Sequence, residues 1–552
     1  MKVNQFLSYI ATGLFMAGAM TSCIGDLNSD VIDPDVKPLD PQKMYVKCYA
    51  SLIMEGNDGS ADFDIDDAGK STLLRNIYNL ECLSTDEAIC WWTDGGLVNA
   101  SYNQSGAEDQ VLRFMYYRLM SNITYCNHYL ETEACLALGK DKAAEVRWIR
   151  AYNYYVLANT FGNVPFLTKI SSEAAPRATR EEMYHWLVSE FRAVEEDLLE
   201  ARPKGSSDPD YGRLDKAAAW LMLSRMYLNA EVWKGDFNDA NGSNLLDSVK
   251  VLSDKIIAEG QYKLFTGESD VNVEGVDCHY TAYDMLFMAD NGESGAATEA
   301  ILPLLQDGAV TRGWGGSLFF TAAHWSTDMK TVCDLSAGTT GVDWTGMRVR
   351  RQLLEKFTDN PEAWEGKTAK EIRAIAGDDR ALFWGKDHFV AIGDNTKFEQ
   401  GLATVKWNNR RSDGNPTNST YEVDGDFFLL RAAEAYLNYV EADIRMNGTC
   451  SEKAKGYMDD IRARAHATAH QTYSLEDVLD ERSREFYCEG YRRTDLIRFG
   501  QYGGNQATYV WDGKNGTTPG TAFGAYRNII RVCELIAAAD TLNILISHYF
   551  LL

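Results

Sequence analysis

Four tryptophans stand in segments where little else would shield their rings. Trp91 and Trp92 precede a Gly-Gly pair, and Trp314 and Trp344 each have glycine within three residues. The flat C–H faces of a sugar ring pack on exposed aromatic rings, while sugar hydroxyls need carboxylate, amide or guanidinium partners at the rim. These segments therefore indicate a carbohydrate-binding surface, although any one such tryptophan, taken singly, more often packs in a core.

Residues for catalysis form no comparable pattern. The sequence contains no G-x-x-x-x-G-K-[ST] phosphate loop, no G-x-S-x-G elbow and no H-E-x-x-H motif, and it has only 8 histidines. A carboxylate pair for glycoside hydrolysis cannot be singled out among 80 acidic residues. The sequence thus predicts a binding protein that is not an enzyme and requires no cofactor.

The net charge of the chain limits the classes of molecule that it is expected to bind. The formal net charge is −26, from 54 basic and 80 acidic residues. Nucleic acid and anionic lipid would be repelled, so neither is expected as the main partner. An acidic surface also keeps an exported protein in solution.

Residues 1–23 have the pattern of an export signal. Lys2 supplies a positive charge, residues 6–20 are apolar, and two small residues directly precede Cys23. This ending resembles the lipobox of bacterial lipoproteins, so Cys23 is expected to become the lipidated first residue, with membrane attachment through acyl chains alone. An ordinary secretory signal with an incidental cysteine is the alternative.

Ten of the eleven cysteines follow this segment, at irregular separations and without a C-x-x-C pair. The spacing argues against zinc. Cys82 with Cys90, or Cys126 with Cys135, could be bridged in an exported protein. Buried free thiols are nevertheless expected for most of them, because a chain of 552 residues does not need covalent staples.

The stretch from Glu145 to Lys169 predicts a long helix with an aromatic face. Gly162 and Pro165 would end this helix. Such a face must pack on other helices, because a sheet face would show a period of two. Its apolar residues recur at three- and four-residue spacing and are Trp148, Ala151, Tyr152, Tyr155 and Ala158.

Further helical patterns lie on both sides of a loop-rich middle. Residues 260–425 are rich in Gly, Asn, Asp, Ser and aromatic residues, and helical periodicity is broken after about Phe287, which predicts long loops with short strands. We expect a tether at 24–42 and one domain at 43–552, with a helical scaffold at about 43–265 and 426–500 and binding loops at about 266–425. The helical patterns cover residues 44–55, 110–136, 175–200, 213–230, 246–259, 427–445, 450–465 and 475–487.

Two long motifs stand out in the helical segments: R-x-x-R-A-Y-x-Y followed by F-G-x-V-P at residues 147–165, and ERSREFYCEGYRRTDLIRFG at residues 481–500. Both resemble the SusD/RagB family of glycan-binding surface lipoproteins of Bacteroidota. The resemblance implies a mostly α-helical, tetratricopeptide-like superhelix decorated with long loops and short strands. The charged side chains of the second motif are interpreted as an ion-pair network joining the last helices to the first, and they are Arg482, Glu485, Glu489, Arg492, Asp495 and Arg498.

The likeness runs to about Asn528 and includes the starch-binding branch of the family. It is carried by the segments LFMADN, ILPLLQDG, AGDDRAL and KWNNRRSDGNP. In that branch three aromatic residues form an arc that follows an α-1,4-glucan, and polar residues bind its hydroxyls. The resemblance places Trp92, Trp314 and Trp344 on the arc, with Trp314 in the middle position, and Arg75 and Asp67 among the polar residues.

One polar position departs from that branch. The asparagine that follows the first arc tryptophan is replaced here by Gly95, next to Asp94. A calcium ion is found in some relatives, and the loop Asp290 to Glu293 has suitable oxygens. Calcium therefore stays possible without being expected.

The resemblance implies a protein on the outer surface of the outer membrane. It would capture α-glucan, as starch or maltooligosaccharide, and deliver it to a SusC-like, TonB-dependent transporter. Two alternatives stay open: the same scaffold binding a different glycan, and a helical-repeat adaptor binding peptide. Residues 529–552 are apolar to the last residue, unlike the family, which leaves a frameshift or true divergence open.

Overall fold

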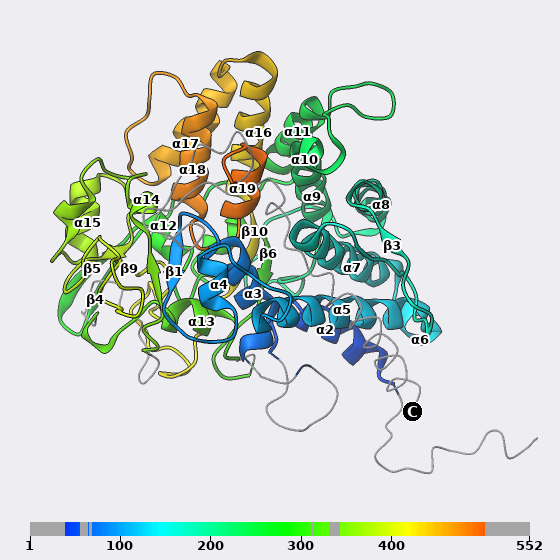
Figure 1. Cartoon of the computed structure of the whole chain (residues 1–552), viewed down its shortest axis with the longest axis horizontal. Helices are drawn as coiled ribbons and strands as arrows, with labels where there is room; N and C mark the ends of the chain where they lie inside the picture. The colour runs from blue at the N-terminus through cyan, green and yellow to red at the C-terminus, as the bar shows by residue number, and fades with distance from the viewer. Residues whose placement is uncertain (1–38, 56–64, 66–68, 311–312, 330–342, 503–552) are drawn as a thin grey trace, which may run out of the picture.

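Helices that pack against one another build most of the scaffold of the molecule (Figure 1). The computed structural model describes residues 39–55, 65, 69–310, 313–329 and 343–502. Within these ranges, no helix is long and apolar enough to cross a membrane. Cys23, most of the tether, Asp67 and the apolar C-terminal segment lie outside the described residues.

The principal helices form a continuous packed series. Helix α5 packs on α7, α7 on α8, α8 on α9, α9 on α11, α11 on α16, and α16 on both α17 and α18. This arrangement confirms the mostly α-helical, tetratricopeptide-like fold class. The bounds are α2 (Pro41–Ala50), α3 (Leu73–Glu81), α5 (Gln110–Glu131), α7 (Lys140–Phe161), α8 (Arg180–Val194), α9 (Lys216–Leu228), α11 (Leu245–Asp254), α16 (Ala432–Asn447), α17 (Glu452–Arg464) and α18 (Leu475–Phe486).

Helix α7 has the aromatic face that its sequence predicts. The rings of Trp148 and Tyr152 stack with centroids 5.4 Å apart, and the ring of Tyr155 stacks on that of Trp233 at 5.9 Å. The helix ends at Phe161, and Gly162 follows with a φ of 80°. A positive φ costs a glycine little, so the chain can turn here.

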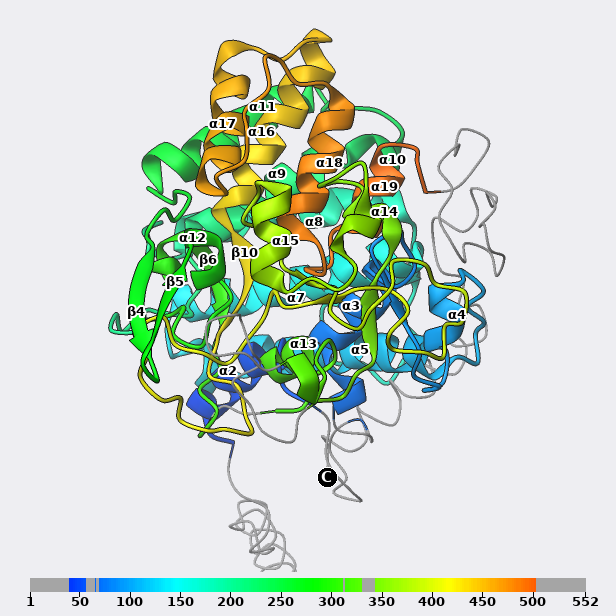
Figure 2. The ribbon, with the colours of Figure 1, turned by 90° about the vertical axis from the view of Figure 1, so that its left-hand side faces the viewer.

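Shorter elements lie mainly between the two helical parts. Figure 2 views the molecule from the side on which α12, α13, α14 and α15 lie in front of the scaffold. These and the remaining short helices are α4 (Leu97–Ser101), α6 (Glu133–Leu136), α10 (Ala230–Lys234), α12 (Ala282–Met285), α13 (Ser317–Ala322), α14 (Arg351–Leu354), α15 (Ala369–Ala376) and α19 (Arg492–Arg498).

Within the described residues, the strands form two-stranded antiparallel sheets, in agreement with the short strands expected from the sequence of the middle region. Two pairs tie that middle to the scaffold: β1 pairs with β7, and β6 pairs with β10. The others are β2 with β3, β4 with β5, and β8 with β9. The strands are β1 (Ala88–Cys90), β2 (Val164–Pro165), β3 (Arg177–Ala178), β4 (Ser269–Val273), β5 (Val276–Tyr280), β6 (Ala300–Leu304), β7 (Met347–Val349), β8 (Phe383–Trp384), β9 (Ala403–Thr404) and β10 (Phe427–Arg431).

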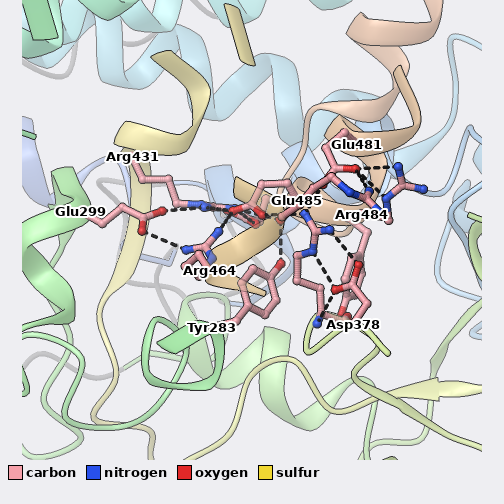
Figure 3. A network of polar contacts seen from close by, with 12 residues as sticks. Tyr283, Glu299, Asp378, Arg431, Arg464, Glu481, Arg484 and Glu485 are labelled. Atoms are coloured by element: carbon pink, nitrogen blue, oxygen red, sulfur yellow. Dashed lines mark hydrogen bonds and ion pairs between the residues drawn. The ribbon is translucent and has the colours of Figure 1, made fainter. Parts of the chain in front are cut away.

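A buried ion-pair network lies where β10, α17 and α18 meet (Figure 3). Arg431 lies 2.9 Å from Glu299 and 2.6 Å from Glu485, and Arg464 contacts both carboxylates as well. Burial acts to raise the pKa of Glu485, but the attraction of Arg464, Arg431 and Arg380 outweighs it and holds this pKa well below its ordinary value. Every charge in this cluster is therefore paired, as burial requires.

The motif at residues 481–500 also joins the C-terminal helices to the first part of the scaffold. Arg492 donates to both carboxylate oxygens of Asp86 at 2.7 Å, and Arg493 donates to Glu81 at the end of α3 at 3.1 Å. Of the six residues predicted to join the last helices to the first, Arg492 makes this connection. The other five form ion pairs with the middle of the chain or among the C-terminal elements.

The cysteine pairs proposed from sequence are not bridged. Cys82, Cys90, Cys126 and Cys135 are free thiols, and all four are buried.

Candidate functional site

Three of the loop tryptophans form one row. The ring centroid of Trp344 lies 6.4 Å from that of Trp92 and 6.1 Å from that of Trp314, with interplanar angles of 56° and 27°. Trp344 is therefore the middle ring, and the expectation that Trp314 occupies this position is wrong. Trp314 is 37% exposed, and the other two are half-buried. Together they form one continuous row of partly exposed aromatic rings.

The β1–β7 pair and helix α13 hold two of these rings. Trp92 follows β1 and donates from its indole Nε1 to the carbonyl of Trp344 at 3.2 Å. The backbone N–H of Trp344 donates to the carbonyl of Ala322, at the end of α13, at 3.0 Å. A Cβ added to Gly346 would lie only 2.1 Å from Trp92 Cε2. The Trp92 ring thus rests directly on glycine backbone.

The third ring is held by the segment before α3. The backbone N–H of Trp314 donates to the carboxylate of Glu55. A Cβ on Gly69 would lie 2.7 Å from Trp314 Cβ, and one on Gly315 would lie 2.0 Å from the hydroxyl of Thr72. Two glycines therefore let the turn at 69–71 approach the Trp314 backbone closely.

Polar side chains border the Trp92 end of the row. The Arg75 guanidinium lies 5.4 Å from the centroid of the Trp92 ring and 5.1 Å from that of Phe319. Its Nη2 lies 3.3 Å from Asp94, which also lies 3.4 Å from Lys70 Nζ. Arg75 thus lies beside the row, and it also forms an ion pair with Asp94. Asp67 lies outside the described residues.

The structure adds an aromatic residue that the sequence reasoning missed. Tyr421 packs edge-on against Trp314, with centroids 5.7 Å apart, and it is 37% exposed. Its segment, N-S-T-Y-E-V-D, has no glycine within three residues. The criterion that singled out the tryptophans therefore passed over it. The feature of the sequence that could have identified Tyr421 is that it is a single aromatic residue in an otherwise mostly polar segment.

The loop considered for calcium is occupied by internal hydrogen bonds. Asp290 accepts from the backbone N–H and hydroxyl of Ser412 at 2.9 and 2.7 Å. Asn291 donates to the carbonyls of Leu286 and Asp426, both at 2.9 Å. Within the described ranges, no group of three or more His, Cys, Asp or Glu side chains is arranged to hold a metal ion.

A superhelix of helix pairs with a row of partly exposed aromatic rings defines a helical-repeat binding protein. Comparison with known proteins identifies its family. Residues 350–535 match the model of the SusD family, and residues 78–228 match a model described as "Starch-binding associating with outer membrane". The chain is 33% identical to the starch-binding protein SusD of Bacteroides thetaiotaomicron, over 95% of each chain. It therefore belongs to the SusD/RagB family.

More distant relatives agree with this assignment. The SusD-like protein P25 of Formosa agariphila is 24% identical over 65% of this chain and 64% of its own. The surface glycan-binding protein A of Bacteroides thetaiotaomicron, solved in complex with laminarihexaose, has a TM-score of 0.60 at 18% identity, covering 91% of this chain and 98% of that one. That likeness shows the shared fold.

Membership of this family establishes the general function of the protein. The protein is a SusD-like surface glycan-binding protein without catalytic activity. The family is associated with the outer membrane.

Proposed function

We propose that the protein captures α-glucan oligosaccharides by stacking successive sugar rings on Trp92, Trp344 and Trp314. The row of three rings, with centroid separations of 6.4 and 6.1 Å, is the observation that carries this proposal. The 33% identity to a starch-binding protein supports the α-glucan class. The aromatic faces supply most of the contact area, and the polar groups beside them fix orientation.

Arg75 and Asp67 are proposed to bind sugar hydroxyls. Arg75 lies next to the Trp92 ring, so its guanidinium N–H groups border the surface on which a sugar would stack. Stacked rings and a few hydrogen bonds give about −4 to −8 kcal/mol, hence dissociation constants of roughly millimolar to micromolar. Weak binding suits a protein that must release its ligand.

The route of the glycan forms part of the same proposal. Acylated Cys23 would hold the protein on the cell surface, and a SusC-like, TonB-dependent transporter would receive the oligosaccharide. The outer-membrane description of the matching family model supports this placement. A Cys23→Ala variant should leave the membrane fraction, whereas continued pelleting would refute acylation.

The direct test is isothermal titration of the mature chain, without residues 1–23, against maltoheptaose and a cyclic α-glucan. Laminarihexaose is the control, because a structure with the same fold was solved with it. Saturable heat with the α-glucans alone supports the proposal. Heat with laminarihexaose alone would instead establish the second candidate, a β-glucan site on the same scaffold.

A single substitution then tests the row. Trp314→Ala should lower α-glucan affinity at least tenfold with little change in melting temperature, because its ring is partly exposed. Phe389→Ala is the matched control, since Phe389 is a 55% exposed ring outside the row. Unchanged affinity for Trp314→Ala would refute stacking on this row.

A further inference from the structure

Trp91 is the loop tryptophan that has no place in the row. The ring pairs that define the row leave it out. Its side chain is half-buried, and its indole Nε1 donates to the backbone carbonyl of Thr345. Its backbone N–H donates to the carbonyl of Gly346 at 3.3 Å. Trp91 therefore binds the segment 344–346, which carries the middle ring of the row.

That segment contains a residue in a disfavoured conformation. Thr345 has a φ of 49°, in the left-handed region. Threonine is branched at Cβ, and residues of this kind rarely adopt a positive φ, because Cβ then crowds a backbone carbonyl. Such conformations persist only where the surrounding structure holds them, and they concentrate at functional sites. Thr345 directly follows Trp344, so the strained backbone lies next to the middle ring.

The peptide unit before Thr345 is held on both sides. Its N–H belongs to Thr345 and donates to the carbonyl of Trp325 at 3.1 Å. Its carbonyl belongs to Trp344 and accepts from the indole Nε1 of Trp92 at 3.2 Å. One hydrogen bond to backbone and one from a side chain of the row therefore fix the orientation of this unit.

The peptide unit after Thr345 is held in the same way. Its N–H belongs to Gly346 and donates to the carbonyl of Ala323 at 2.8 Å, and its carbonyl accepts from Trp91. The φ and ψ angles of Thr345 set the rotation between the two units, so these four hydrogen bonds together hold Thr345 in its strained conformation. Trp91 supplies the one that comes from a side chain outside the row.

We propose that Trp91 is a positioning residue for the glycan site, whose indole N–H holds segment 344–346 in the conformation that places the Trp344 ring in the row. The inference rests on the proposed glycan site. A ring that is held in place before the ligand arrives loses less freedom on binding, so the same contacts give tighter binding. Without the Trp91 donor, Thr345 can relax toward a negative φ, and the Trp344 ring turns away from its neighbours.

The first variant is Trp91→Phe, which keeps an aromatic ring and removes the indole N–H. It should lower the affinity of the mature chain for maltoheptaose at least fivefold, as measured by isothermal titration. Trp220→Phe is the matched control, because Trp220 donates from its indole Nε1 to Glu195 in the helical scaffold at 2.6 Å. This control loses the same type of donor and should keep wild-type affinity. Melting temperatures verify that both variants are folded.

A second substitution tests whether Trp91 acts through Thr345. Asparagine adopts the left-handed conformation more readily than threonine, so Thr345→Asn keeps this backbone conformation without relying on the Trp91 hydrogen bond. In the Thr345→Asn background, Trp91→Phe should therefore lower affinity less than twofold. Comparison within each background cancels any direct effect of the asparagine on the sugar.

Amide hydrogen exchange of the ligand-free chain measures the same role without sugar. Trp91→Phe should raise the exchange rates of the Thr345 and Gly346 amides at least fivefold, because segment 344–346 then opens more often. The Thr345→Asn substitution should remove this increase. Trp220→Phe should leave the exchange of both amides unchanged.

The outcomes separate this inference from the proposed function. A wild-type chain that binds no α-glucan would overturn the proposed function and the inference with it. Wild-type binding of maltoheptaose, with Trp91→Phe within twofold of it, would overturn the inference alone. Equal losses of affinity in the two backgrounds, or a loss without faster exchange at Thr345 and Gly346, would also overturn it, because Trp91 would then act on the sugar by another route.

Discussion

Two regions of the molecule combine arginines, aromatic rings and carboxylates, with opposite exposure. Arg431 lies 4.5 Å from the Phe486 ring, and the side chains of Arg431 and of its partner Glu485 are fully buried. Arg75 lies 5.4 Å from the Trp92 ring, but its partner Asp94 is 30% exposed. A buried charge must keep its partners, so the first region specifies the fold. The second leaves rings and charges accessible, so it is available for a ligand.

Removing the central carboxylate of the buried network should have the largest effect. Glu485→Ala removes the one carboxylate that pairs with all three of Arg431, Arg464 and Arg380, and so leaves an excess of buried positive charge. Breaking such a buried pair costs about 3–5 kcal/mol of unfolding free energy. Denaturant unfolding measures this loss.

An exposed ion pair supplies the control for that measurement. Glu293 pairs with Arg411, and the Glu293 side chain is 55% exposed. Glu293→Ala should cost less than about 1 kcal/mol, because solvent screens the pair. Equal losses for the two variants would contradict the contrast between the regions.

The second-largest expected effect is a loss of unfolding free energy in acid, again through the buried ion pairs. Burial acts to raise the pKa of Glu441, but Arg498 and Arg445 outweigh it and lower this pKa from 4.5 to about 2. The carboxylate is therefore a weaker base in the folded than in the unfolded state. Its contribution is fully present above pH 4.5 and is lost as the pH falls toward 2.

The expected magnitude follows from the size of this shift. One such group contributes on the order of 3 kcal/mol. Urea unfolding at pH 6 and pH 3 should differ by about 2 kcal/mol through this group, because at pH 3 the Glu441 carboxylate is still mostly ionised in the folded state. Equal unfolding free energies at the two pH values would show that the pairing of Glu441 with Arg498 contributes nothing.

The sequence predicted which charged side chains of residues 481–500 form ion pairs, but it did not predict the distant residues with which they pair. Charges spaced three or four residues apart on one helix indicate a shared face, so the role of Arg482, Glu485 and Arg498 could be inferred locally. The partner of Arg492 could not, because Asp86 lies 406 residues earlier in the chain. No local pattern encodes such a distant pairing.

The binding surface shows the same limit. Flanking glycines identified Trp314 and Trp344 as poorly shielded, and the family resemblance placed them on one arc. Glu55, which holds the Trp314 backbone, lies 259 residues away, and Tyr421 has no glycine beside it. Loop residues that meet only through the fold require the structure.

A variant that displaces the Trp92 ring without removing it tests whether the position of this ring matters for binding. A methyl group on Gly346 would lie within 2.6 Å of three atoms of the Trp92 ring, so the ring must move. Gly346→Ala should therefore lower α-glucan affinity about tenfold, equivalent to about 1.4 kcal/mol, while all three tryptophans stay in the chain. Titration with maltoheptaose measures the change. Wild-type affinity in this variant would show that ring placement at Trp92 does not matter.

The smallest effect is expected at a glycine in the scaffold. Gly456 lies on α17, and a Cβ there would meet nothing within 4 Å. Gly456→Ala should raise the unfolding free energy by about 0.5–1 kcal/mol, because alanine is the better helix former, and should leave glycan affinity unchanged. Combined with Gly346→Ala, it should raise stability while affinity stays low. Recovery of affinity in the double variant would mean that stability, and not the position of the Trp92 ring, limits binding, and the two regions would then not be separable.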